Sequence, residues 1–433
     1  MARAKKEAAL TPEERLQAAL VPDWEWPYKL PENWCWLKLV ESFDNHTDSK
    51  KKIKQKDYLV KGKLAVVDQG QELIGGYTND VEKSYSGALP IVIFGDHTRC
   101  IKFVDFPFAQ GADGVKVLRP KPFYLQKAFY YALQSVNIPN LGYRRHFPLF
   151  NKFSIPLPPL AEQQRIVDRI ESLFAKLDEA KEKAQAVVDS FETRKAAILH
   201  KAFTGELTAK WRKEHGVGME SWEVRTLDSV CSSIFDGDHM PPPKAESGIP
   251  FLVISNVNTG HLTFENTRFV PQEYYDTLSD TRKPQLGDVL YTLVGSFGIP
   301  VVVNSKRPFC FQRHMALLRP IDVSPQFLWY ILQTPEMYDK ASSIATGTAQ
   351  LTVPIKGLRA MTIPRPNIAE QVEIVRILDG FFAREQSAKE AAEAVLDQIN
   401  LMKKSILARA FRGELGTNDP SEESAVELLK QII

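Results

Sequence analysis

Apolar residues recur in alternating steps of three and four over two long stretches of the chain. The first stretch carries them at Ile166, Ile170, Leu173, Leu177, Phe191 and Ile198, and the second at Ile374, Leu378, Phe381, Ile399 and Ile406. Arg194 and Glu385 are the single polar interruptions of the two series. This spacing is typical of the buried seam of a coiled coil. We therefore predict two long helices that each need a partner along one face.

The two stretches are copies of one another. Residues 154–207 and 362–415 align without a gap, and 25 of the 54 aligned positions are identical. Prolines precede each copy, and a proline cannot continue a helix. Gly205 and Gly413 follow the last apolar positions as helix caps. The pattern predicts uninterrupted helices from residue 161 to 203 and from residue 369 to 411.

The connectivity predicts how the two helices pair. The first helix leaves one globular half and leads to the other, and an antiparallel second helix would lead back. Parallel pairing would need a long return connection, which the sequence does not contain. We therefore predict an intramolecular antiparallel coiled coil with pseudo-twofold symmetry, which holds two domains at a fixed separation.

The two globular halves share several sequence features, but the segments between these features differ. Each has an aromatic start (Trp34 and Trp222) and a later Leu-Arg-Pro followed by an aromatic helix. Short β-branched runs bounded by Gly, Pro, Asn or Asp predict strands at 62–68, 89–94, 287–294 and 299–304. The fold class is therefore α+β, with two mixed α/β domains. We expect an N-terminal arm with a short helix (1–29), a first domain (30–153), a first spacer helix (154–210), a second domain (211–361), a second spacer helix (362–415) and a tail helix (416–433). The arm and the tail should pack together.

Composition narrows the function. The net charge is only +2, so any basic surface must be local. No stretch has the roughly 20 apolar residues of a membrane span, and the N-terminus lacks a secretory signal. Cys35, Cys100, Cys231 and Cys310 are too dispersed for a metal site or a disulfide framework. Free thiols in a cytoplasmic protein are the expected state.

The repeat and its flanks resemble the specificity subunit of Type I restriction-modification systems. The most specific parts are the two I-P-x-P-x-x-x-E-Q motifs, which begin at Ile155 and Ile363, and the two A-F-x-G-E-L motifs, which end at Leu207 and Leu415. The segments LPIVIFGDHTRCIKFVDFPFAQGADGVKVL and FQRHMALLRP are similar to target-recognition domains of that family.

The resemblance implies a protein without catalytic activity or a cofactor of its own. Two target-recognition domains would each read one half of a bipartite, asymmetric site in double-stranded DNA. The paired helices would set the spacer and dock two modification subunits, which bind S-adenosylmethionine and methylate adenine. Restriction subunits, which use ATP and Mg²⁺, would then join.

Candidate DNA contacts lie where basic, aromatic or small polar residues gather in the divergent segments. In the first half they are Lys50, Lys51, Lys52 and Lys54, the turn residues His97 and Arg99, and the patch Tyr143, Arg144, Arg145 and His146. In the second half they are Ser296, Arg313, His314, Thr346, Thr348 and Gln350. Alternatives stay open: the lysine run suits either phosphates or solvent, and the turn suits either DNA or a structural role.

The sequence lacks the motifs of the enzyme classes that act on DNA or bind nucleotides. The chain has no Gly-rich cofactor turn after a strand and no P-loop, and Pro241–Pro243 lacks the neighbours of an adenine methyltransferase loop. Carboxylates that resemble a nuclease cluster, such as Asp178 and Glu182, fall on the polar helix face. The remaining alternative is a coiled-coil adaptor that binds proteins only. Steep salt dependence of DNA binding distinguishes the two hypotheses.

Overall fold

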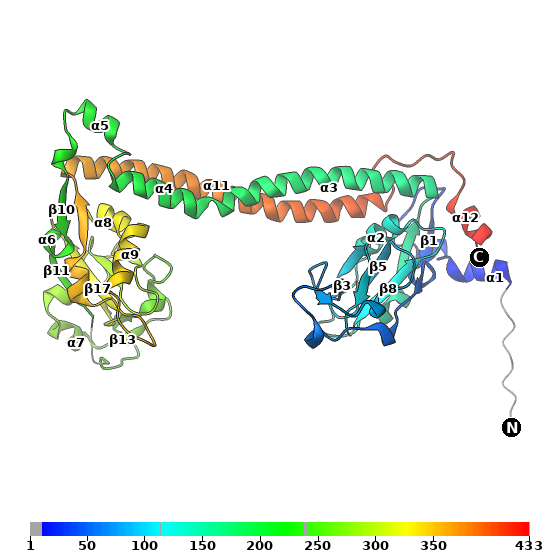
Figure 1. The fold of residues 1–433 in the computed structure, drawn as a ribbon, viewed down its shortest axis with the longest axis horizontal. Helices are drawn as coiled ribbons and strands as arrows, with labels where there is room; N and C mark the ends of the chain where they lie inside the picture. The colour runs from blue at the N-terminus through cyan, green and yellow to red at the C-terminus, as the bar shows by residue number, and fades with distance from the viewer. Residues whose placement is uncertain (1–10, 113, 238–240, 433) are drawn as a thin grey trace, which may run out of the picture. The chain divides into compact units, whose positions relative to one another are not determined.

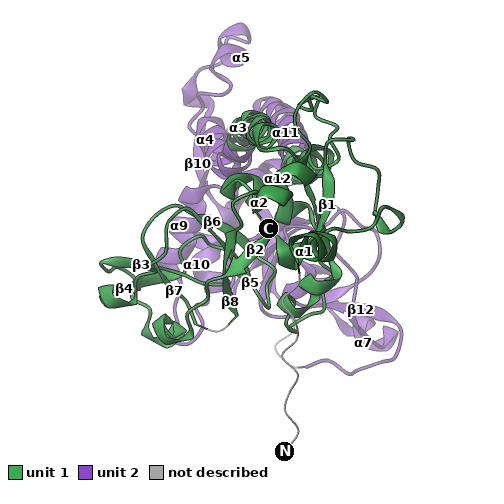
Figure 2. Ribbon diagram, turned by 90° about the vertical axis from the view of Figure 1, so that its right-hand side faces the viewer, with its two compact units in different colours: residues 1–184, 394–433 green, residues 185–393 purple. Residues whose placement is uncertain are grey.

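The computed structural model describes residues 11–112, 114–237 and 241–432. They form two compact units, coloured separately in Figure 2: unit 1 comprises residues 1–184 and 394–433, and unit 2 comprises residues 185–393. The division falls within both long helices. Each unit therefore combines one globular domain with part of each helix, so the units do not coincide with divisions drawn along the sequence.

Unit 1 is built on three small sheets. Its strands are β1 (Cys35–Lys38), β2 (Phe43–Asn45), β3 (Leu64–Val67), β4 (Gly76–Thr78), β5 (Ile91–Gly95), β6 (Ile101–Val104), β7 (Phe108–Gln110), β8 (Val115–Pro120) and β9 (Ser154–Leu157). A four-stranded antiparallel sheet has the order β2-β8-β5-β6, and a three-stranded sheet has the order β4-β3-β7, with β3 and β7 parallel. β1 pairs with β9. Helix α2 (Gln126–Ser135) packs on the four-stranded sheet and buries Phe129.

Unit 2 repeats this plan. Its strands are β10 (Glu223–Thr226), β11 (Cys231–Asp236), β12 (Ile249–Leu252), β13 (Arg268–Val270), β14 (Val289–Thr292), β15 (Pro300–Val302), β16 (Cys310–Phe311), β17 (Met315–Pro320) and β18 (Thr362–Arg365). The orders β11-β17-β14-β15, β13-β12-β16 and β10-β18 match those of unit 1 strand for strand, including the parallel pair β12–β16. The two halves are one fold with different loops, and all four predicted strand runs are strands.

Short helices complete both units. Unit 1 has α1 (Pro12–Ala19) and α12 (Ala425–Ile432), and unit 2 has α5 (Ala209–Glu214), α6 (Leu227–Val230), α7 (Gln272–Thr277), α8 (Pro325–Ile331), α9 (Pro335–Ile344) and α10 (Ile355–Ala360). Thr11 and Glu14 form a capping box at the start of α1. Leu16 and Ala19 of α1 share one core with Ala425 and Leu429 of α12, so the arm and the tail pack together as predicted.

The long helices are α3 (Leu160–Asp189), α4 (Phe191–Phe203) and α11 (Ile368–Ala410), all visible in Figure 1. Gly205 and Gly413 have φ of 85° and 75°, as expected of glycine caps. The prediction of an uninterrupted first helix was wrong, because Ser190 separates α3 from α4. The Ser190 hydroxyl donates to the carbonyl of Ala186, and the Arg194 guanidinium reaches Ser190 and the Val187 carbonyl. Such side-chain bonds to a preceding turn bend a helix.

Polar contacts show that the helices run antiparallel within each unit. In unit 2, Arg194 and Glu385, the two residues that interrupt the predicted seams, form an ion pair of 2.7 Å. Lys389 lies 5.0 Å from the ring centre of Phe191 in the same unit. Going back along the first helix from Arg194 to Phe191 therefore corresponds to going forward along the second from Glu385 to Lys389, as in an antiparallel pair. In unit 1, Lys403 binds Asp178 and lies over Phe174. The polar interruptions therefore set the register of the pair.

The predicted seam residues divide into three groups. Ile166 and Ile170 are buried in the core of unit 1, and Ile374 and Leu378 in the core of unit 2, so these helix ends pack on the globular domains. Ile399 is also buried. Half-buried positions are Leu173, Leu177, Phe191, Ile198, Phe381 and Ile406. A narrow helix pair leaves its seam partly accessible, whereas a sheet and a second helix cover a side chain completely.

The Glu-Gln motif ties each helix start to its domain. In unit 2, Glu370 is fully buried and accepts hydrogen bonds from Thr208 (2.6 Å), Arg212 (2.5 Å) and the Trp222 indole (2.9 Å). The amide oxygen of Gln371 accepts the backbone N–H of Ser324. The segment that follows α4 is thus held at the start of α11.

Unit 1 contains the same arrangement with a different charge balance. Glu162 accepts hydrogen bonds from the Trp34 indole and the Thr417 hydroxyl, both at 3.0 Å. Arg165 does not neutralise it directly, because its guanidinium forms a two-pronged ion pair with Glu422. Burial raises the pKa of Glu162 above its ordinary value, and the Trp34 and Thr417 hydrogen bonds oppose that rise.

Candidate nucleic-acid interface

The turn after β5 in unit 1 organises several predicted contact residues. Asp96 is buried, and its Oδ1 accepts the backbone N–H of His146 (2.9 Å) and of Phe147 (2.7 Å). Its carbonyl lies 2.9 Å from Nδ1 of His146. The loop of residues 138–147 is therefore fastened to the β5 turn through the carboxylate and the backbone carbonyl of Asp96.

Two of the predicted DNA contacts are parts of this fastening. His146 is fully buried, and its Nε2 accepts the N–H of Leu141 at 3.1 Å, so its assignment as a DNA contact was wrong. Arg99 has a φ of 62°, and its guanidinium donates to the Ile138 carbonyl at 3.0 Å. A left-handed conformation at a non-glycine residue is held by its surroundings. Of the two roles left open for the turn, Arg99 has the structural one.

Tyr143 stands at the exposed end of the same loop. It is 84 % exposed, and its ring stacks on His97 with centres 4.7 Å apart and planes inclined by 15°. Nδ1 of His97 lies 3.1 Å from the Tyr143 carbonyl, and the His97 N–H donates to Gln69. Arg144 and Arg145 are exposed beside it. The loop thus presents an aromatic face and two cations to solvent.

A cavity of about 660 Å³ adjoins Tyr143 in unit 1. Its lining includes the following residues: Lys52, Lys54, Lys56, Tyr58, Asp68, Gln69 and Tyr143. Of the predicted lysines, Lys52 and Lys54 line the cavity, Lys50 is exposed outside it, and Lys51 donates to the Ser84 carbonyl at 3.0 Å. Burial and the nearby Asp68 raise the pKa of Tyr58 to about 12, so this phenol stays a neutral donor. The sequence did not single out Tyr58 or Gln69.

Backbone hydrogen bonds gather the predicted contacts of unit 2. The N–H of Leu293 donates to the His314 carbonyl (2.8 Å), and that of Val353 donates to the Leu293 carbonyl (2.9 Å). Gly295 in turn donates to Leu351. Three segments far apart in the sequence therefore lie together: residues 293–296, 313–314 and 346–353.

The loop of residues 346–352 is an exposed hairpin tip. Thr346 and Thr352 exchange backbone hydrogen bonds of 2.9 and 2.8 Å. Thr348 and Gln350 are exposed within it, and the Gln350 amide lies over Gly295, where an added Cβ would be 3.2 Å away. Ser296 is also exposed. These residues expose polar side chains on a loop whose backbone is fixed by hydrogen bonds. The sequence predicted these residue types, but it did not predict that they would lie together.

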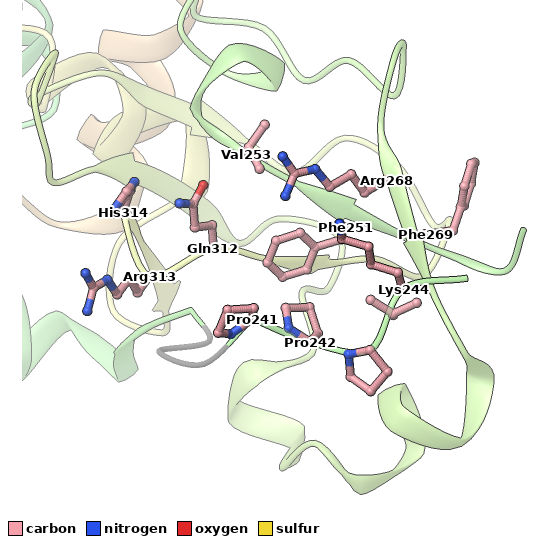
Figure 3. Close-up of a pocket in the computed structure, with 12 residues that line it drawn as sticks. Pro241, Pro242, Lys244, Phe251, Val253, Arg268, Phe269, Gln312, Arg313 and His314 are labelled. Atoms are coloured by element: carbon pink, nitrogen blue, oxygen red, sulfur yellow. The ribbon is translucent and has the colours of Figure 1, made fainter. Parts of the chain in front are cut away.

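A second cavity, of about 500 Å³, lies beside Arg313 and His314 (Figure 3). In that view Phe251 lies between Arg268 and Gln312 on one side and Pro241 and Pro242 on the other. The lining residues also include Lys244, and none of them is acidic. Burial and the Arg313 charge lower the pKa of His314, which is therefore neutral near pH 7. The cavity is positively charged and partly apolar.

The sequence missed three of these lining residues. Lys244 and Arg268 are isolated cations in segments without a periodic pattern, and only the fold brings them to Arg313. Gln312 stands directly before the predicted Arg313-His314 pair, so adjacency was the available signal.

No group of three or more His, Cys, Asp or Glu side chains suited to a metal occurs among the described residues. Within the same residues, no helix has the length and apolarity to cross a membrane.

Comparison with known proteins agrees with this architecture. The family model described as "Type I restriction modification DNA specificity domain" matches residues 31–188 and 219–396. These matches cover most of the chain. The chain therefore belongs to the Type I restriction-modification specificity-domain family, as the resemblance predicted.

Individual relatives are distant. The EcoKI specificity subunit of Escherichia coli K12 is 28 % identical over 305 residues, which are 65 % of this chain and 64 % of the relative. The EcoR124I/EcoR124II specificity subunit of Escherichia coli is 23 % identical over 372 residues, which are 80 % of this chain and 86 % of that one. The chain thus spans just under two thirds of the length of EcoKI and similar relatives.

A solved structure from work on assembly of the type I R-M system has a TM-score of 0.64 at 21 % identity, over 90 % of this chain and all of that chain. The HsdS subunit from Thermoanaerobacter tengcongensis has a TM-score of 0.56 at 21 % identity and the same coverage. These structures share the fold of this chain.

Proposed function

We propose that this chain is the DNA-specificity subunit of a Type I restriction-modification complex. The observation that carries the proposal is one fold present twice, with a basic cavity in each copy and different loops around it. Two unlike surfaces on equivalent frames suit two unlike half-sites, so the recognised site would be bipartite and asymmetric. The family membership supports this assignment.

The chain acts by binding and not by catalysis. Lysines and arginines at the cavities contact phosphates and position the domains, and Gln312, Arg313, Gln350 and the Tyr143 loop contact bases. The long helices set the distance between half-sites and dock two modification subunits. S-adenosylmethionine belongs to those subunits, and ATP with Mg²⁺ to the restriction subunits that join them. The complex works in the cytoplasm.

Mapping methylated adenines in cells that carry the chain and its cognate modification subunit tests the proposal. The expected result is one two-part, non-palindromic motif with a fixed gap. The purified complex should also lose DNA affinity steeply as salt rises, because phosphate contacts release counterions. Salt-insensitive binding, or methylation without a motif, would support the protein-adaptor alternative instead.

Arg313→Ala should relax one half of the motif and leave the other half intact. An arginine that binds a base edge contributes about 1–3 kcal/mol of discrimination, so preference at that position should fall roughly 5- to 150-fold. Competition binding with single-base variants of the site measures this. Arg307→Ala is the matched control, since Arg307 is exposed in the same unit but stacks on Phe264 outside the cavity. Equal loss at both half-sites would contradict the assignment.

A further inference from the structure

The loop that carries Tyr143 is held far more tightly than a solvent-exposed loop requires. Two backbone N–H groups bind Asp96, His146 bridges the Asp96 carbonyl and Leu141, and Arg99 reaches Ile138. These groups lie on both sides of Tyr143 in the sequence. The loop is therefore a rigid support for the exposed ring of Tyr143.

That ring has one covered face and one open face. His97 stacks on the first face and is itself fixed by its hydrogen bonds to Gln69 and to the Tyr143 carbonyl. Because only one face is free, Tyr143 can take a single flat group and not the two neighbours of an intercalated ring. An aromatic side chain held in this way loses little conformational entropy on stacking.

The chemistry beside the open ring suits a nucleotide. The cavity that Tyr143 helps to line carries Lys54 and Lys56 for a phosphate and Gln69 and Asp68 for polar base edges. Phosphate charge, a polar edge and a flat π-face are the three features that a nucleotide presents.

We propose, building on the function proposed above, that Tyr143 stacks on one base of the first half-site that has left the helical stack, with the adjoining cavity taking its nucleotide. Asp96, Arg99 and His146 are positioning residues, and His97 supports the ring from behind. The first domain thereby reads the deformability of its half-site as well as base edges, because unstacking is easiest at flexible steps.

The test uses the reconstituted complex and a duplex that carries the mapped motif, with 2-aminopurine placed at successive positions of the half-site that Arg313→Ala does not affect. Unstacking raises 2-aminopurine fluorescence. We expect one position to brighten with the natural chain and with Tyr143→Phe. With Tyr143→Ala, that position should stay dark and affinity should fall about 5- to 100-fold.

Trp24→Ala is the matched control, because Trp24 is also 84 % exposed in unit 1 but does not line the cavity. It should leave brightening and affinity unchanged. A base drawn out by the modification subunit would brighten in every variant and marks that event separately. If the complex binds its site specifically but no 2-aminopurine position brightens in a way that depends on Tyr143, the inference is overturned and the proposed function is not. Absence of specific binding by the natural chain overturns the proposed function.

Discussion

Glu370→Gln should destabilise unit 2 by about 3–5 kcal/mol, the largest effect that we expect of one conservative replacement. The substitution removes the charge that balances Arg212, whose side chain is only 8 % exposed. It also removes an acceptor, since both carboxylate oxygens are in use: Oε1 binds Thr208 and Arg212, and Oε2 binds Trp222. One end of an amide donates, so one of these donors loses its partner.

Hydrogen–deuterium exchange measures the effect best, because a chain of two units need not unfold in one step. Peptides that contain Trp222 and residue 370 should exchange faster in the variant, while peptides of unit 1 keep their protection. Glu373→Gln is the control: Glu373 pairs with the exposed Arg376, and such a pair contributes at most about 1 kcal/mol. Equal protection in the Glu370 and Glu373 variants would contradict the role of the buried charge.

The repeat supplies a second comparison at the equivalent residue of unit 1. Glu162 has two neutral donors and no buried arginine, so Glu162→Gln can satisfy both partners: its oxygen accepts from Trp34, and its amide donates to Thr417. The pKa of Glu162 is raised, so its favourable contribution is present at low pH and is lost as the pH rises through the folded-state pKa. The variant should lack this decline and keep its stability at pH 7.

These contrasts show what sequence patterns can and cannot predict. The repeat fixed the helix limits to within one residue, because period, prolines and glycine caps are local properties of the chain. It marked Glu162 and Glu370 as equivalent, and they are. It did not distinguish their surroundings, because Arg212 comes from a segment that the repeat does not include. The Ser190 break was likewise hidden, since a serine in a helix reveals its bond to the preceding turn only in three dimensions.

The candidate sites divide in the same way. Residue type and local clustering selected Tyr143 and Arg144, which are exposed, and Arg313, which lines a cavity. The same clustering misassigned His146, because a histidine next to two exposed arginines gives no sign that its own side chain turns inward to Asp96. Lys244 and Arg268 reach the second cavity from separate segments, one at β13. Their grouping follows from strand order, which the sequence of the divergent loops does not encode in any periodic pattern.

Asp96→Ala should weaken recognition of the first half-site about as strongly as Tyr143→Ala, although Asp96 is buried and touches no DNA. Removal of its carboxylate leaves the N–H group of Phe147 without its acceptor, which costs about 1–3 kcal/mol, whereas the N–H of His146 keeps the Asp96 backbone carbonyl at 2.8 Å. The part of the loop next to Phe147 should then loosen, and Tyr143 loses its fixed position. Asp96→Asn keeps an oxygen where Oδ1 accepts both bonds and should retain most of the affinity.

A double variant separates this positioning role from general destabilisation. If Asp96 acts through Tyr143, Asp96→Ala in a Tyr143→Ala background should lower affinity for the first half-site little further, whereas independent sites would add their losses. Fluorescence anisotropy of the complex with the mapped duplex gives these affinities, and hydrogen exchange of residues 138–147 reports the loop. Additive losses, or an undisturbed loop in Asp96→Ala, would show that the buried carboxylate does not hold the reading surface. Non-additive losses would mean that one buried acceptor, 47 residues before Tyr143 in the sequence, decides whether that ring can meet its base.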